Sequence, residues 1–227
     1  MNVASLCRLD KQISHDLLTN QGTRLLLMCT GTIMFMSGLF GASFGMWCSI
    51  QQMIYAAIKM PAMVISVVLL SAMGNTVLAQ ALGARLSFRQ VCTCMLLGFA
   101  IMSTLLASFT PITIFALTNA AGFHTEAAVH TYPLLLLMNT GLVALAGSLG
   151  VLKLYQLLIT LTHSRTIARR VLTAWLGVCG LVGSELSWLF SPFLARPGVP
   201  TPFINPNAFS SNFFEYLWEH LMEFMTY

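Results

Sequence analysis

Glu185 is the residue whose chemistry calls most for an explanation, because it places a carboxylate inside the otherwise apolar stretch GLVGSELSWLF. A charge in hydrocarbon is costly unless it is paired, protonated or in contact with water, so such a residue is a candidate for function. A partner is expected at similar depth. Lys59 is the first candidate, since its long side chain can reach inward from the start of an apolar run, and Arg196 is the second.

Two interpretations of Glu185 follow from its position. In the first, a structural ion pair between Glu185 and Lys59 fixes two membrane helices to each other. In that case Glu185→Ala lowers the yield of folded protein more than the double change with Lys59→Ala, because the single change strands a buried cation. In the second interpretation, Glu185 is a site that responds to protons or to a ligand.

The other reactive side chains do not form a recognisable site. Cys92 and Cys94 have the wrong spacing for a zinc or redox pair, and the loop residues His124, Glu126 and His130 lack a further nearby ligand. The chain has no glycine-rich phosphate loop, no His-Glu-x-x-His sequence and no nucleophile elbow. We therefore expect no metal, no cofactor and no enzymatic activity. An intramembrane enzyme would need a second catalytic group beside Glu185.

The composition indicates which elements must position these residues. Hydrophobic residues make up 57% of the 227 residues and charged residues only 8%, whereas roughly 25% charged is typical of soluble domains. A membrane helix needs about 20 apolar residues, and five runs have this length: about 25–48, 61–82, 91–118, 133–160 and 171–194. The prediction is an all-α, polytopic membrane bundle over 25–194, between an amphipathic tail (1–24) and a C-terminal region (195–227).

Basic residues predict the orientation, because Lys and Arg are enriched on the cytoplasmic side. They cluster before the first run, between the second and third, and between the fourth and fifth: Arg8, Lys11, Arg24, Arg85, Arg89, Arg165, Arg169 and Arg170. The N-terminus is therefore expected in the cytoplasm and the C-terminus outside. No basic cluster with interleaved aromatic residues indicates nucleic-acid binding.

The C-terminal region is expected to contain an extended segment followed by an amphipathic helix. Prolines at four positions of 195–208 prevent a regular helix. Asn212 then fits an N-cap, with Glu215 three residues later as in a capping box. The apolar face of this helix could lie in the membrane interface or bind protein. Its candidate partner-binding residues are Phe213, Leu217, Trp218 and Leu221.

Small residues recur at helix-packing spacings in three of the runs. They are Ser37, Gly41 and Gly45; Ala146 and Gly150; and Gly177, Gly180 and Gly183. They can pack this bundle internally or form a homo-oligomeric interface. Pro61 is expected to open the second helix, and Pro111 to kink or break the third.

Two stretches resemble Yip1-like membrane proteins. In LGARLSFRQVCTCMLLGFAIMSTLLASFTPITIF, residues 82–115, the similar positions are Gly83, Ser87, Phe88, Arg89 and Pro111. The block GSELSWLFSPF, followed by PGVPTPFINPNAFSSNFFE, is similar to one in uncharacterised bacterial five-helix proteins, where the position of Ser191 is more often Arg. The resemblance implies five membrane helices with the N-terminus inside, and a bacterial inner membrane location. Eukaryotic members of the family are similar to partners of small GTPases in membrane traffic.

The sequence therefore predicts a non-catalytic membrane protein that acts as a scaffold or accessory subunit. Its partners would be the lipid bilayer and either a second membrane subunit or another copy of itself. The alternative is a homo-oligomeric channel or transporter in which Glu185 lies on the conducted path, with Lys59 and Arg196 as the other charged groups.

Overall fold

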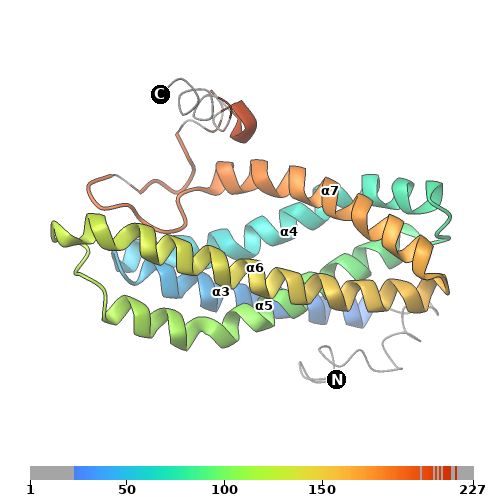
Figure 1. The fold of residues 1–227 in the computed structure, drawn as a ribbon, viewed down its shortest axis with the longest axis horizontal. Helices are drawn as coiled ribbons and strands as arrows, with labels where there is room; N and C mark the ends of the chain where they lie inside the picture. The colour runs from blue at the N-terminus through green and yellow to red at the C-terminus, as the bar shows by residue number, and fades with distance from the viewer. Residues whose placement is uncertain are drawn as a thin grey trace.

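The fold is an all-α bundle of five long helices (Figure 1). The computed structural model describes residues 23–199, 201–206, 208, 210, 212–215 and 218, and no strand occurs among them. The helices are α3 (Thr23–Gly45), α4 (Ile50–Ala81), α5 (Phe88–Thr118), α6 (Ala127–Thr162) and α7 (Arg165–Phe190). Each is long and apolar enough to cross a membrane, as expected of an integral membrane protein.

Successive helices run in opposite directions along the bundle, so its two ends differ in character (Figure 1). The basic end holds the start of α3, the α4–α5 turn and the α6–α7 turn, with Arg24, Arg85, Arg89, Arg165, Arg169 and Arg170. At the other end lie the α3–α4 and α5–α6 loops and the proline-rich segment, residues 191–206, which follows α7. We call this end of the bundle, which carries the proline-rich segment, the segment end.

Two helices begin well before the apolar runs that predicted them. The structure starts α4 at Ile50, where the Ser49 side chain accepts a hydrogen bond from the Gln52 N–H, so the expected start at Pro61 is wrong. Pro61 and Pro133 lie inside α4 and α6. The physical reason is length: α4 has 32 residues and is about 48 Å long, against roughly 30 Å of hydrocarbon. The helix therefore extends beyond the apolar run into residues 50–60, where Gln51, Gln52 and Lys59 interrupt the apolar sequence.

The third helix is continuous through Pro111, so the break considered there does not occur. Its start has the capping box that Ser87 and Gln90 form, in which each side chain binds the backbone N–H of the other residue. The preceding turn contains Gly83 at φ +89°, a backbone conformation that residues with a Cβ rarely adopt.

Small residues of α3 and α6 pack the bundle internally, whereas two glycines of α7 do not. A Cβ on Gly41 would lie 2.4 Å from the Ala56 carbonyl oxygen, and one on Gly150 would lie 3.1 Å from the Gly98 carbonyl oxygen. These glycines therefore permit close approach of α3 to α4 and of α5 to α6. Gly177 and Gly180 have nothing within 4 Å of an added Cβ.

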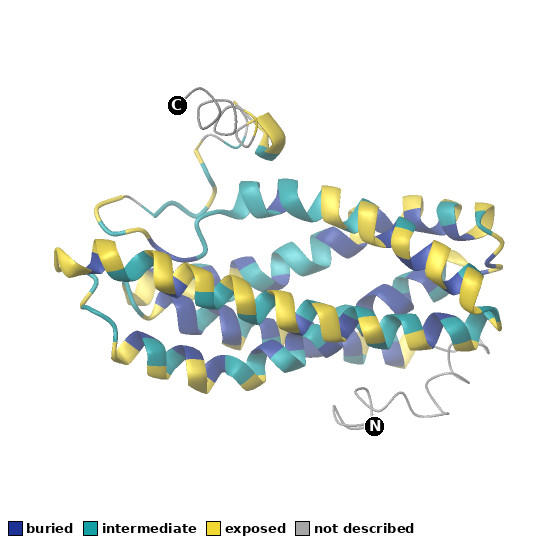
Figure 2. Ribbon diagram, in the orientation of Figure 1, coloured by how far each residue is buried: buried dark blue, intermediate teal, exposed yellow. Residues whose placement is uncertain are grey.

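Two hydrophobic clusters form the interior of the bundle. The larger one lies toward the basic end and contains Leu25, Cys29 and Ile33 of α3, with Trp175 of α7. The smaller one joins Phe40 and Phe44 of α3 to side chains of α5 and α6, and it includes Leu194 of the proline-rich segment. By contrast, much of α6 is exposed on the outside of the bundle, as expected for a surface that faces lipid (Figure 2).

Candidate functional site

The candidate site is the surface on which the proline-rich segment lies against the helices. Leu194 and Ala195 of this segment are almost completely buried. Leu194 belongs to the same cluster as Phe40, Phe44 and Leu135, so the segment contributes to the interior of the bundle. Its conformation is therefore part of the fold, and the polar contacts around it define the site.

Lys59 is the central polar residue of this surface. Its side chain is fully buried, and it lies nine residues after Ile50, about 13 Å from the first residue of α4. The Lys59 Nζ donates to the carbonyl oxygens of Pro192 and Pro202, both at 3.1 Å. It also lies 5.5 Å from the centre of the Phe203 ring, within cation–π range. One amine thus joins two points of the segment that are ten residues apart.

Gln52, two turns before Lys59 on α4, supports the same part of the segment. Its Nε2 donates to the carbonyl oxygens of Pro192, at 3.3 Å, and Phe193, at 3.2 Å. Lys59 and Gln52 therefore share the Pro192 carbonyl as an acceptor. The Gln52 side chain is 1% exposed, and its Oε1 has no hydrogen-bond partner in the part of the chain that the structure describes. Sequence reasoning missed Gln52, although its spacing of seven from Lys59 places both on one helix face.

The prolines explain why carbonyl groups are free to bind Lys59. A proline has no N–H and its ring prevents continuation of a helix, so neighbouring carbonyls lack the partners that regular structure supplies. A buried carbonyl without a partner costs free energy, and in hydrocarbon water cannot supply the missing donor. Lys59 and Gln52 supply donors to three such carbonyls.

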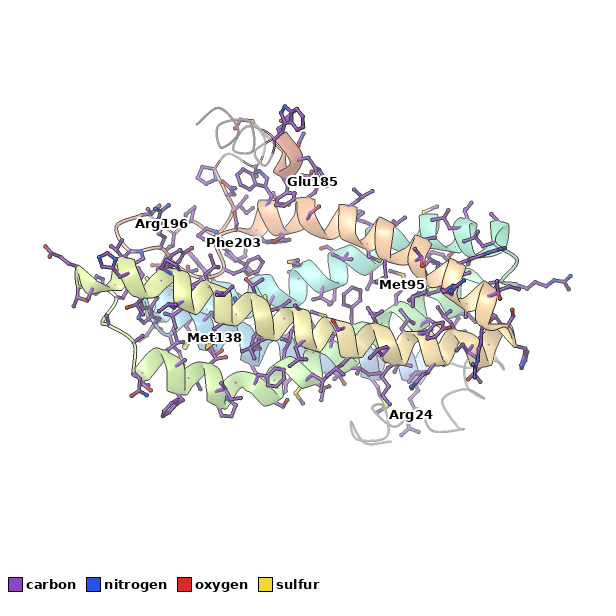
Figure 3. All side chains as sticks on the ribbon, in the orientation of Figure 1. Arg24, Met95, Met138, Glu185, Arg196 and Phe203 are labelled. Carbon is purple, nitrogen blue, oxygen red and sulfur yellow. The ribbon has the colours of Figure 1, made fainter. Side chains whose placement is uncertain are left out.

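Glu185 binds a different part of the C-terminal region. Its Oε2 accepts a hydrogen bond of 3.3 Å from the backbone N–H of Phe213, the first described helical residue after Asn212. A carboxylate at a helix N-terminus is stabilised by the unpaired N–H groups and by the helix dipole. Figure 3 shows Glu185 on α7, with Phe203 and Arg196 closer to the segment end.

The expected ion pair between Glu185 and Lys59 does not occur among the described residues, where the two groups have separate partners. The charge on Lys59 is compensated by backbone carbonyl dipoles, and Glu185 binds backbone N–H. Arg196 is not the partner either: its side chain is exposed and lies in a pocket with Tyr132. Lys59 and Glu185 both hold the C-terminal region, but they bind different parts of it.

The capping box predicted at Asn212 is confirmed. The Asn212 Oδ1 accepts from the Glu215 N–H at 2.8 Å, and the Glu215 Oε2 accepts from the Asn212 N–H at 3.1 Å. Phe213 is half-buried and Trp218 is exposed. The other two candidate partner-binding residues, Leu217 and Leu221, lie outside the described residues.

Asn205 forms a third attachment that the sequence did not indicate. Its backbone N–H donates to the Leu189 carbonyl at 3.1 Å, and its Nδ2 donates to the Trp188 carbonyl and the Ser191 Oγ, both at 3.2 Å. These groups belong to the last turn and the C-cap of α7, where carbonyl oxygens take no part in the regular hydrogen bonds of the helix. Asn205 therefore caps α7 and ties the segment back to it.

We expect Glu185→Gln to loosen the start of the C-terminal helix without changing the bundle. The amide keeps an acceptor but loses the charge, which at a helix N-terminus is worth about 1 kcal/mol. Hydrogen exchange at residues 213–215 should become about fivefold faster, a ratio that corresponds to this free energy. Glu126→Gln is the matched control, because the Glu126 side chain makes no capping bond to α6. Equal exchange in the wild type and both variants would contradict the role of Glu185.

Comparison with family models, with characterised proteins and with solved structures found no match to this chain.

Proposed function

We propose that the chain is a non-catalytic integral membrane protein that acts as a scaffold or accessory subunit and presents its proline-rich segment to a protein partner. The observation that carries the proposal is the use of Lys59: a fully buried amine whose donors are directed at two carbonyls of that segment. The Lys59 amine in this position holds the proline-rich segment in place and so orders its surface. Its partners are backbone groups that cannot take part in proton transfer at neutral pH.

The exposed face of the C-terminal region has the composition of a protein-binding surface. Val199, Ile204, Phe214 and Trp218 are large apolar residues of which 43 to 62% is exposed. Aromatic residues contribute strongly to protein interfaces, and a surface that is ordered before binding loses less entropy when a partner docks. Three separate attachments, by Lys59, Glu185 and Asn205, provide such order.

We also propose an orientation in the membrane and a family for the chain. Membership of the Yip1-like proteins, with the basic end in the cytoplasm of a bacterium, would place the proline-rich segment on the outer face of the inner membrane. The alternative, a homo-oligomeric channel or transporter, requires Glu185 to exchange protons or ions. The hydrogen bond from Phe213 N–H to this carboxylate favours the scaffold instead.

Site-specific photo-crosslinking in native membranes tests the proposal. A photoreactive residue in place of Ile204 should give one protein adduct of defined mass, and the same residue in place of Leu152 should not. Leu152 is 56% exposed on α6 and serves as the matched lipid-facing control. Lys59→Met should remove the Ile204 adduct, because the surface is no longer held.

Each result of this experiment has a definite meaning. An adduct of twice the chain mass identifies a second copy as the partner, and a different mass identifies another subunit. The absence of any protein adduct at Ile204, together with a monomer in native mass spectrometry, would contradict the scaffold function.

A further inference from the structure

A second feature at the segment end is a pocket of about 370 Å³ between the proline-rich segment and α6. Val129, Tyr132, Pro133 and Leu136, from the first turns of α6, form one wall, and Arg196 and Pro197 form the other. The pocket thus combines one guanidinium and one phenol with an apolar surface. None of the contacts that hold the C-terminal region, at Lys59, Glu185 or Asn205, uses these side chains.

The charge of Arg196 has no acidic partner in the part of the chain that the structure describes. The described acidic residues are Glu126, Glu185 and Glu215, and none forms an ion pair with Arg196. Glu185 and Glu215 bind the backbone N–H groups of Phe213 and Asn212. The electrostatic neighbour of Arg196 is Tyr132, which can donate a hydrogen bond but brings no negative charge at neutral pH. Among the described residues, nothing therefore balances the positive charge of the pocket.

The pocket lies at the first turns of α6, a helix that is longer than a hydrocarbon layer is thick. Because α6 has 36 residues and is about 54 Å long, its first turns extend past a hydrocarbon layer of roughly 30 Å. Val129 and Leu136 are exposed in the pocket, and Leu137 continues the exposed apolar surface toward the middle of the helix. A cation at the interface above an apolar surface matches an amphiphile that has an anionic head and a hydrocarbon chain.

We propose that this pocket binds one anionic phospholipid. Its phosphate accepts hydrogen bonds from the Arg196 guanidinium and the Tyr132 hydroxyl, since Arg presents paired donors that suit phosphate oxygens. One acyl chain lies along Val129 and Leu136. The lipid thereby bridges the proline-rich segment and α6. This inference goes beyond the scaffold function and does not depend on a protein partner.

Lipid photo-crosslinking with defined vesicles tests the inference. The full-length protein is placed in phosphatidylcholine vesicles that contain either phosphatidylglycerol or phosphatidylcholine with a photoreactive acyl chain. We expect the peptide of residues 127–140 to be labelled at least threefold more by the phosphatidylglycerol probe. Arg196→Gln should reduce this labelling about tenfold, and Tyr132→Phe about threefold. Arg165→Gln, which removes an exposed arginine at the basic end, should leave it unchanged.

Three results would overturn the inference. The first is equal labelling of this peptide by the two lipids, and the second is undiminished labelling in Arg196→Gln. The third is competition by millimolar inorganic phosphate, which would assign the pocket to a soluble anion. Because Arg196 is exposed, Arg196→Gln should keep the wild-type melting temperature, so that loss of labelling reports on binding. If Ile204 adducts persist while labelling fails, the lipid site is rejected and the scaffold function is retained.

Discussion

Replacement of Lys59 by Met is expected to lower the free energy of unfolding by about 2 to 3 kcal/mol. This value is the contribution of the hydrogen bonds from the charged amine, reduced by the cost of burying that amine. The variant removes both hydrogen bonds that the Nζ donates to the segment, while it keeps a similar volume in the buried site. Pro192 keeps the bond from Gln52, but the Pro202 carbonyl loses the donor that Lys59 supplies. The loss should therefore concentrate on the proline-rich segment.

Reversible unfolding in mixed micelles measures this change. Lys153→Met is the matched control: it removes the same amine from α6, where the Lys153 side chain is only half-buried. A loss of stability as large in Lys153→Met as in Lys59→Met would mean that the contacts of Lys59 with the segment contribute nothing specific.

The double variant Lys59→Met with Glu185→Gln distinguishes two independent anchors from an ion pair between these residues. Because the two groups hold separate backbone sites, their effects should add to within about 0.5 kcal/mol. A direct pair would instead give a coupling of about 1 to 3 kcal/mol. Rescue of one variant by the other would restore the ion-pair interpretation.

Replacement of Gly41 by Ala is expected to have the other large effect, a loss of about 2 to 3 kcal/mol from overpacking. The new Cβ would lie 2.4 Å from the Ala56 carbonyl oxygen and 2.8 Å from the Met60 Cγ. The first of these atoms is backbone and cannot rotate away, so α3 must move away from α4. Thermal unfolding in lipid nanodiscs measures the loss.

Gly31→Ala on the same helix provides the comparison, because nothing lies within 4 Å of a Cβ at Gly31. The higher helix propensity of alanine should make this variant neutral or more stable by up to about 1 kcal/mol. Equal stability of the two variants would show that α3 and α4 are not in the close contact seen at Gly41.

The architecture was largely predictable from the sequence because it follows from composition and periodicity. Apolar runs located five membrane helices, and the Asn212 capping box is local, so its spacing alone identified it. The helix ends were less predictable. The start of α4 at Ile50 lies among polar residues, and hydrophobicity records where hydrocarbon ends rather than where a helix ends.

The contacts of the site could not be predicted, for a specific physical reason. Acidic side chains are visible in a sequence, so Glu185 was the natural partner for Lys59. Backbone carbonyls are present at every residue, and the sequence does not show which of them will lack a donor. The chain returns to α4 after Phe190, and this tertiary arrangement alone brings Pro192 and Pro202 to the Nζ.

The most direct test of the account is the accessibility of a buried residue in the proline-rich segment. Ala195 is 1% exposed, whereas Val199, four residues later, is 52% exposed. Cysteines at each position are treated with a water-soluble maleimide in membranes, and labelling is quantified peptide by peptide. We expect Ala195→Cys to be protected in the otherwise wild-type protein and labelled after Lys59→Met, with Val199→Cys labelled in both. Protection of Ala195→Cys that persists after Lys59→Met would contradict the claim that Lys59 holds the segment.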